Sequence, residues 1–127
     1  MRQLLKLLVL LLLPAFSFAG PSLQYEPAVV QLTGKVSSGK FQHPNGDWVT
    51  FFTLTIPEPV SINADPANPT NIAESDITQV QLFAPSAGLQ KALKAKAGKS
   101  ARVKGSLFHA HTAWHRRPLV MSVSAVE

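Results

Sequence analysis

Three histidines, His109, His111 and His115, lie within seven consecutive residues near the C-terminal end of the chain. Neutral imidazole is a ligand for both zinc and copper. On a β-strand, side chains two residues apart share a face, so His109 and His111 would project together. If the chain brought His115 back beside them, a water molecule, His43 or a carboxylate would supply the fourth ligand, and a site with water would be open. The spacing therefore makes these histidines candidate ligands for zinc or copper.

The same histidines also suit a polar turn between two strands. Val103 and Leu107 share the parity of His109, so a regular strand would direct the histidine pair toward the end of the core. A bulge at Gly105 would reverse that orientation. Histidines in such a turn hydrogen-bond to nearby backbone carbonyl groups instead of binding a metal. The sequence leaves open both interpretations and the orientation of the pair.

Two arginines, Arg116 and Arg117, follow the histidines, beside Trp114 and just before Pro118. Tryptophan and arginine are among the residue types most enriched at the energetic centres of protein interfaces, and arginine forms two-pronged pairs with carboxylates. Proline restricts the backbone, which lowers the entropy lost when the arginines bind a partner. We therefore predict a binding surface formed by Phe108, Trp114, Arg116 and Arg117.

Basic residues are concentrated in one part of the chain. Residues 20–90 carry six acidic and two basic side chains, whereas residues 91–117 carry eight basic side chains and no acidic one. Such a block attracts phosphate, acidic glycans or an acidic protein face, although a solvated surface that keeps a protein soluble has the same composition. The eight are Lys91, Lys94, Lys96, Lys99, Arg102, Lys104, Arg116 and Arg117.

Motifs that support catalysis are missing from the sequence. It contains no cysteine, no glycine-rich phosphate loop and no Gly-x-Ser-x-Gly elbow. The acidic residues Asp65, Glu74 and Asp76 do not have the spacing of a calcium-binding loop. We therefore expect a protein that is not an enzyme, with no cofactor unless the histidines bind zinc or copper.

The N-terminal residues have the layout of a secretory signal peptide. Arg2 and Lys6 precede an apolar run over residues 7–13, and small side chains follow at Ser17 and Ala19. The run is shorter than the roughly 20 residues that a membrane span needs. We predict cleavage after Ala19 and a single periplasmic domain over residues 20–127, without disulfides or a lipid anchor because no cysteine is present.

The pattern of apolar residues predicts an all-β domain with one short helix. Pairs of strands are expected on either side of turn residues such as Asn45–Gly46, and Gly34 and Gly105 would let two strands bend. Five strands with a helix between the third and the fourth indicate a small OB-like barrel, with an open antiparallel sheet as the alternative. The expected strands cover residues 30–36, 48–56, 77–84, 100–108 and 119–126, and the helix covers residues 87–99.

Three segments resemble a known family. They are "YEPAVVQLTG" at residues 25–34, "INADP" at residues 62–66 and "VKGSLFHAHTAWHRRP" at residues 103–118. Together they are similar to an uncharacterised family of exported bacterial proteins, domain-of-unknown-function family 4431. The resemblance implies a periplasmic, Gram-negative setting and no particular activity. Relatives are richer in histidine after "HAHT", where this chain has Ala113, Trp114, Arg116 and Arg117, which favours a contact surface over a metal site.

These observations favour a non-catalytic periplasmic binding domain of OB-like fold. Its partner would be an envelope or secreted protein, including a toxin or muramidase that an inhibitor or immunity protein neutralises. One alternative is a metal-binding protein that uses the three histidines. Another is a binder of glycans or anionic polymers that uses Trp114, Arg116 and Arg117. We expect no nucleic-acid partner, because an exported protein rarely meets intracellular nucleic acid.

Overall fold

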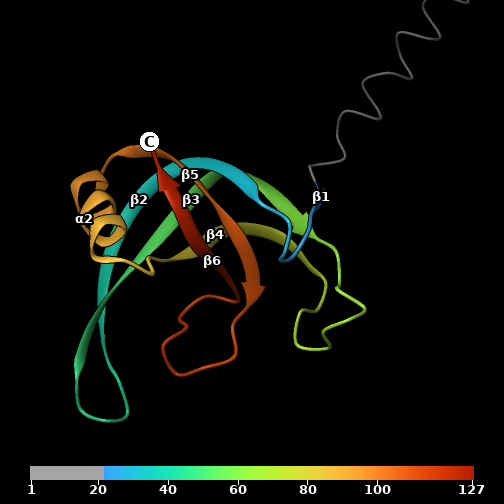
Figure 1. Cartoon of the computed structure of the whole chain (residues 1–127), viewed down its shortest axis with the longest axis horizontal. Coiled ribbons are helices and arrows are strands. Elements are labelled where there is room, and N and C mark those ends of the chain that lie inside the picture. The colour runs from blue at the N-terminus through green and yellow to red at the C-terminus, as the bar shows by residue number, and fades with distance from the viewer. Residues whose placement is uncertain (1–21) are drawn as a thin grey trace, which may run out of the picture.

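Six strands and one helix account for the regular structure of residues 22–127, which is the part of the chain that the computed structural model describes (Figure 1). The expected signal peptide over residues 1–19 lies outside the described residues. The elements are β1 (Ser22–Leu23), β2 (Val30–Gln42), β3 (Trp48–Ile62), β4 (Glu74–Phe83), α2 (Ala87–Lys96), β5 (Ser100–His109) and β6 (Leu119–Val126).

Five of the strands close into a barrel. The pairing runs β5–β2–β3–β4–β6 and returns from β6 to β5, and only the β4–β6 pair is parallel. Helix α2 joins the third and fourth strands of this barrel. This is the order of an OB-type barrel, so the expected fold is confirmed and the open sheet is not formed. Strand β1, which the sequence pattern did not predict, adds to the barrel by pairing in parallel with β3.

The core lies inside the barrel and follows the alternation of apolar residues along each strand. Val36, Leu54, Val80 and Val103 are fully buried and come from four different strands. Helix α2 adds Leu93, which is also fully buried. The helix begins where the side chain of its N-cap residue Ser86 accepts a hydrogen bond from the Leu89 amide, and it ends before Gly98, which has a positive φ of 81°.

Strand β3 is longer than expected. The sequence predicts an end at Ile56, because Pro57 and Pro59 follow, yet the strand continues to Ile62. Both prolines are exposed and lie where the register between β3 and β4 shifts, between Thr55 and Val60. A ladder hydrogen bond is not needed there, so the missing proline N–H costs nothing. The other ends also differ: β2 runs on to Gln42, β4 begins at Glu74, β5 includes His109 and α2 stops at Lys96.

Gly34 and Gly105 lie where the backbones of neighbouring strands approach closely. A Cβ atom on Gly34 would collide with the backbone carbonyl of Thr55 on β3. A Cβ atom on Gly105 would collide with the carbonyl of Ser122 on β6, and the register of β5 shifts by a bulge between Lys104 and Gly105. The bulge at Gly105, which the sequence left open, is therefore present, and at Gly34 the chain makes a close backbone approach.

Within residues 22–127, no helix has the length and apolar character that crossing a membrane requires.

Candidate binding site

Two connections project from the same end of the barrel (Figure 1). The hairpin loop, residues 43–47, joins β2 to β3, and the histidine turn, residues 110–118, joins β5 to β6. The base of the histidine turn is closed by a 2.8 Å hydrogen bond from the Ala110 amide to the Pro118 carbonyl. The rings of His43 and Trp114 stack with their centres 4.0 Å apart, which joins the two connections.

A buried glutamine holds the histidine turn against the barrel. Gln81 lies on the outer side of β4, and its Oε1 accepts hydrogen bonds from the amides of Arg116 and Arg117. Its Nε2 donates a 3.0 Å hydrogen bond to the Trp114 carbonyl. Residue spacing does not indicate Gln81, because a glutamine between Val80 and Leu82 has the pattern of an ordinary solvent-facing strand position.

His115 organises the turn from within. Its Nδ1 accepts hydrogen bonds from the amides of His111 and Thr112, at 3.1 and 3.2 Å. An atom that accepts these bonds carries no proton, so the side chain is neutral with its proton on Nε2. Burial, and secondly the charge of His111, lower the pKa of His115 from its ordinary value of 6.5.

This arrangement predicts a pH-dependent stability. Because the folded protein binds a proton at His115 less readily than the unfolded chain does, the contribution of His115 is complete above pH 6.5 and falls as the pH drops below that value. The change His115→Asn keeps an oxygen acceptor near the Nδ1 position and removes the titration. In urea unfolding from about pH 7.5 to about pH 5, the wild type should therefore lose stability more steeply than His115→Asn. Parallel pH profiles for the two proteins would contradict this role of His115.

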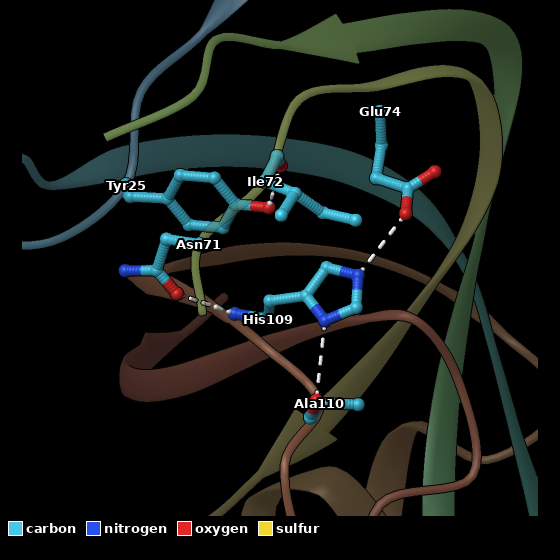
Figure 2. Close-up of polar contacts among 6 residues, drawn as sticks. All are labelled: Tyr25, Asn71, Ile72, Glu74, His109 and Ala110. Carbon is cyan, nitrogen blue, oxygen red and sulfur yellow. Dashed lines mark hydrogen bonds and ion pairs between the residues drawn. The ribbon is translucent and has the colours of Figure 1, made fainter. Parts of the chain in front are cut away.

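His109 belongs to a different contact network, shown in Figure 2. Its Nε2 lies 3.0 Å from Oε1 of Glu74, and its Nδ1 lies 3.1 Å from the Ala110 carbonyl oxygen. The His109 amide donates to Oδ1 of Asn71, a residue of the long connection between β3 and β4. In the same region the buried Tyr25 hydroxyl donates a 2.6 Å hydrogen bond to the Ile72 carbonyl. Burial, and secondly the negative charge of Glu74, raise the pKa of Tyr25 to about 12.

The three histidines are therefore not assembled as a metal site. Both ring nitrogens of His109 face Glu74 and Ala110, and Nδ1 of His115 accepts backbone amides. Strand β5 ends at His109, so His111 lies beyond it and the pair does not share a strand face. Among residues 22–127, no group of three or more histidine, aspartate or glutamate side chains is placed to hold a metal ion.

The predicted binding residues of the turn lie on the outer surface of the barrel. The Arg116 guanidinium lies 4.6 Å from the centre of the Phe41 ring, and Nε of Arg117 lies 3.4 Å from Oγ1 of Thr53. Phe108 is partly buried and packs edge-on against His115, with ring centres 5.2 Å apart. Trp114 is 44% exposed. The arginines point across β2 and β3, while the tryptophan faces a groove.

This groove has a volume of about 900 Å³. Trp114 lines it together with two other exposed aromatic residues, Trp48 at 70% and Phe83 at 49% exposure. Lys91 and Lys94 of α2 form a basic part of its wall. Residue type and spacing alone indicate neither Trp48 nor Phe83 as a binding residue. An exposed position for both could have been suspected, because Trp48 directly follows a turn and Phe83 has the opposite parity to Val80 and Leu82.

By its fold and its site, this protein is a closed OB-type barrel with an aromatic groove that loops border. Residues 79–127 match the model of a family described as a domain of unknown function, DUF4431, which confirms the predicted resemblance over that stretch. No curated protein matches the chain. Among solved structures, the chain is similar to the SSB of Plasmodium falciparum in its complex with ssDNA, with 19% identity and a TM-score of 0.41 over 78% of this chain and 90% of that one.

Proposed function

We propose that this protein is a non-catalytic binding domain that acts in the periplasm and recognises an envelope or secreted protein. The observation that carries the proposal is the convergence of three exposed aromatic side chains, Trp48, Phe83 and Trp114, on one groove. Large aromatic rings that are left exposed together are typical of protein interfaces, where they contact apolar groups of the partner. The secretory layout of residues 1–19 supports the periplasmic setting.

The contacts that hold the surroundings of the groove support the same proposal. Gln81 anchors the histidine turn to β4, and His115 satisfies two amides inside it. The stack of His43 on Trp114 holds the two connections together. A surface that is already ordered loses little conformational entropy when a partner binds, so more of the contact energy appears as affinity. An inhibitor or immunity protein that covers an envelope-acting toxin or muramidase would use such a preformed surface.

The experiment that tests this function measures affinity rather than capture alone. A partner recovered from envelope extract with the domain of residues 20–127 is purified, and its dissociation constant is measured for wild type, Trp114→Ala and Trp48→Ala. We expect each change to weaken binding by about 30-fold, as for hot-spot tryptophans. Arg116→Ala, which removes the exposed guanidinium on Phe41, should weaken binding in the same direction.

Val29→Ala is the matched control. Val29 is 70% exposed, as Trp48 is, but does not line the groove. This change should leave both affinity and circular dichroism as in wild type. If Val29→Ala weakens binding while the two tryptophan variants bind normally, the interface lies elsewhere and the proposal is wrong.

A further inference from the structure

We propose that the partner inserts an extended acidic segment with a central apolar side chain into this groove, placing its carboxylates against α2. This inference rests on the proposed function and specifies the chemistry of the partner. The apolar side chain would contact the aromatic rings, and the carboxylates would pair with Lys91 and Lys94.

The first support is the charge of the helical wall. Lys91 and Lys94 are exposed and three residues apart on α2, so they lie on one face of the helix, and both line the groove. Neither has an ion-pair partner within residues 22–127. Lys94 is in the last turn of α2, where the helix dipole stabilises a positive charge. Lys91 is one turn earlier, so the dipole stabilises its charge only a little. The helical wall of the groove therefore presents two unpaired positive charges to a ligand that binds there.

The second support is the distribution of charge, which favours a protein segment over a polyanion. A nucleic acid or a sulfated glycan carries charge regularly along its length and needs basic groups that follow it. Here both lysines come from α2, the exposed aromatic rings of Trp48 and Phe83 line the groove away from the helix, and Asp47 of the hairpin loop lines it as well. A polyanion would set negative charges over the aromatic rings and beside Asp47. A peptide can place an apolar side chain at the rings and carboxylates only where the lysines are.

Lys91 and Lys94 should affect mainly the rate at which the partner associates. Exposed charges at the edge of an interface steer the encounter and set its salt dependence, whereas the buried aromatic contacts hold the complex. Replacing Lys91 and Lys94 with glutamate should therefore slow association by about tenfold at low salt and reduce the dependence of affinity on salt.

The experiment uses two synthetic peptides as probes: a central Phe flanked by glutamates, and the same peptide with glutamines. Each is titrated into isotope-labelled domain while the indole signals of Trp48 and Trp114 are followed by NMR, at about 50 mM and about 300 mM NaCl. We expect the acidic peptide to shift both indole signals and to bind about tenfold more tightly than the glutamine peptide at low salt. Lys91→Glu/Lys94→Glu should remove this difference.

The control variant is Lys35→Glu/Lys99→Glu, which changes the net charge equally at two exposed lysines that do not line the groove. It should keep most of the preference for the acidic peptide. Equal binding of the two peptides, or equal losses in the two double variants, would overturn the inference. So would tighter binding of heparin or oligo-dT than of the acidic peptide at the same indoles, because the occupant would then be a polyanion.

Binding of the purified partner to the variants tests this inference and the proposed function separately. If Trp114→Ala abolishes partner binding while Lys91→Glu/Lys94→Glu binds as wild type does, the acidic-segment inference fails and the binding function stands. If the partner is insensitive to both tryptophan changes, the proposed function itself fails.

Discussion

Replacing Gly34 with alanine is expected to lower the free energy of unfolding by about 3 kcal/mol. The new methyl group would meet the carbonyl oxygen and carbon of Thr55 and the Cα of Ile56, all of which are backbone atoms of β3. A flexible side chain could rotate away, but backbone atoms can yield only if β2 and β3 separate locally. Such a separation would weaken the ladder that holds Lys35 opposite Thr55.

Gly88→Ala on α2 is the matched control for this prediction. Apart from its chain neighbours and the backbone of α2 itself, no atom lies within 4 Å of a Cβ added at Gly88, and alanine is favoured over glycine in a helix. This change should raise the stability by up to about 1 kcal/mol. Urea denaturation of the two variants and the wild type measures both effects. A Gly34→Ala protein as stable as Gly88→Ala would show that the barrel wall is more adaptable than its geometry indicates.

The change Gln81→Leu is expected to lower the free energy of unfolding by about 2 kcal/mol and to weaken partner binding strongly. Leucine has a similar volume but removes the acceptor for the amides of Arg116 and Arg117 and the donor to the Trp114 carbonyl. Part of the lost hydrogen-bond energy is regained from the apolar side chain. The histidine turn would then lose its anchor on β4, so Trp114 would no longer be preordered for binding.

Gln79→Leu separates this effect from a general change of strand composition. Gln79 lies two residues earlier on β4, is exposed, and pairs with Thr55 of β3. We expect little change in stability or affinity for this variant. Partner affinity is measured by calorimetry and the order of the turn by the NMR linewidth of the Trp114 indole. If Gln81→Leu bound the partner as tightly as Gln79→Leu does, preordering of the turn would not matter for recognition.

The barrel could be predicted from the sequence because its core follows a simple alternation. Leu54 and Val80 point inward as expected, and Gly34 and Gly105 mark the places where two strands approach closely. The extension of β3 past Pro57 could not be predicted, because it depends on the shift of register against β4 and on which strand edge needs no hydrogen bond. Both are properties of paired strands rather than of one segment.

The candidate site was predicted only in part. Trp114 was identified from its residue type and neighbours, but the groove that it faces is formed with Phe83 and Lys91, which lie far from it in sequence. The role of His115 as an acceptor for two amides depends on the path of the turn, and His109 pairs with Glu74 across 35 positions of sequence. Residue spacing alone indicated that the three histidines could bind one metal ion together.

The contacts of His109 have a consequence for how this end of the molecule opens. Through its amide and ring, His109 holds Asn71 and Glu74 at one side and Ala110, the first residue of the histidine turn, at the other. His109 therefore connects the long β3–β4 connection to the base of the histidine turn. Local unfolding that frees one also exposes the other, so the two segments form one cooperative unit. Hydrogen exchange should report them with a common protection, distinct from that of the barrel strands.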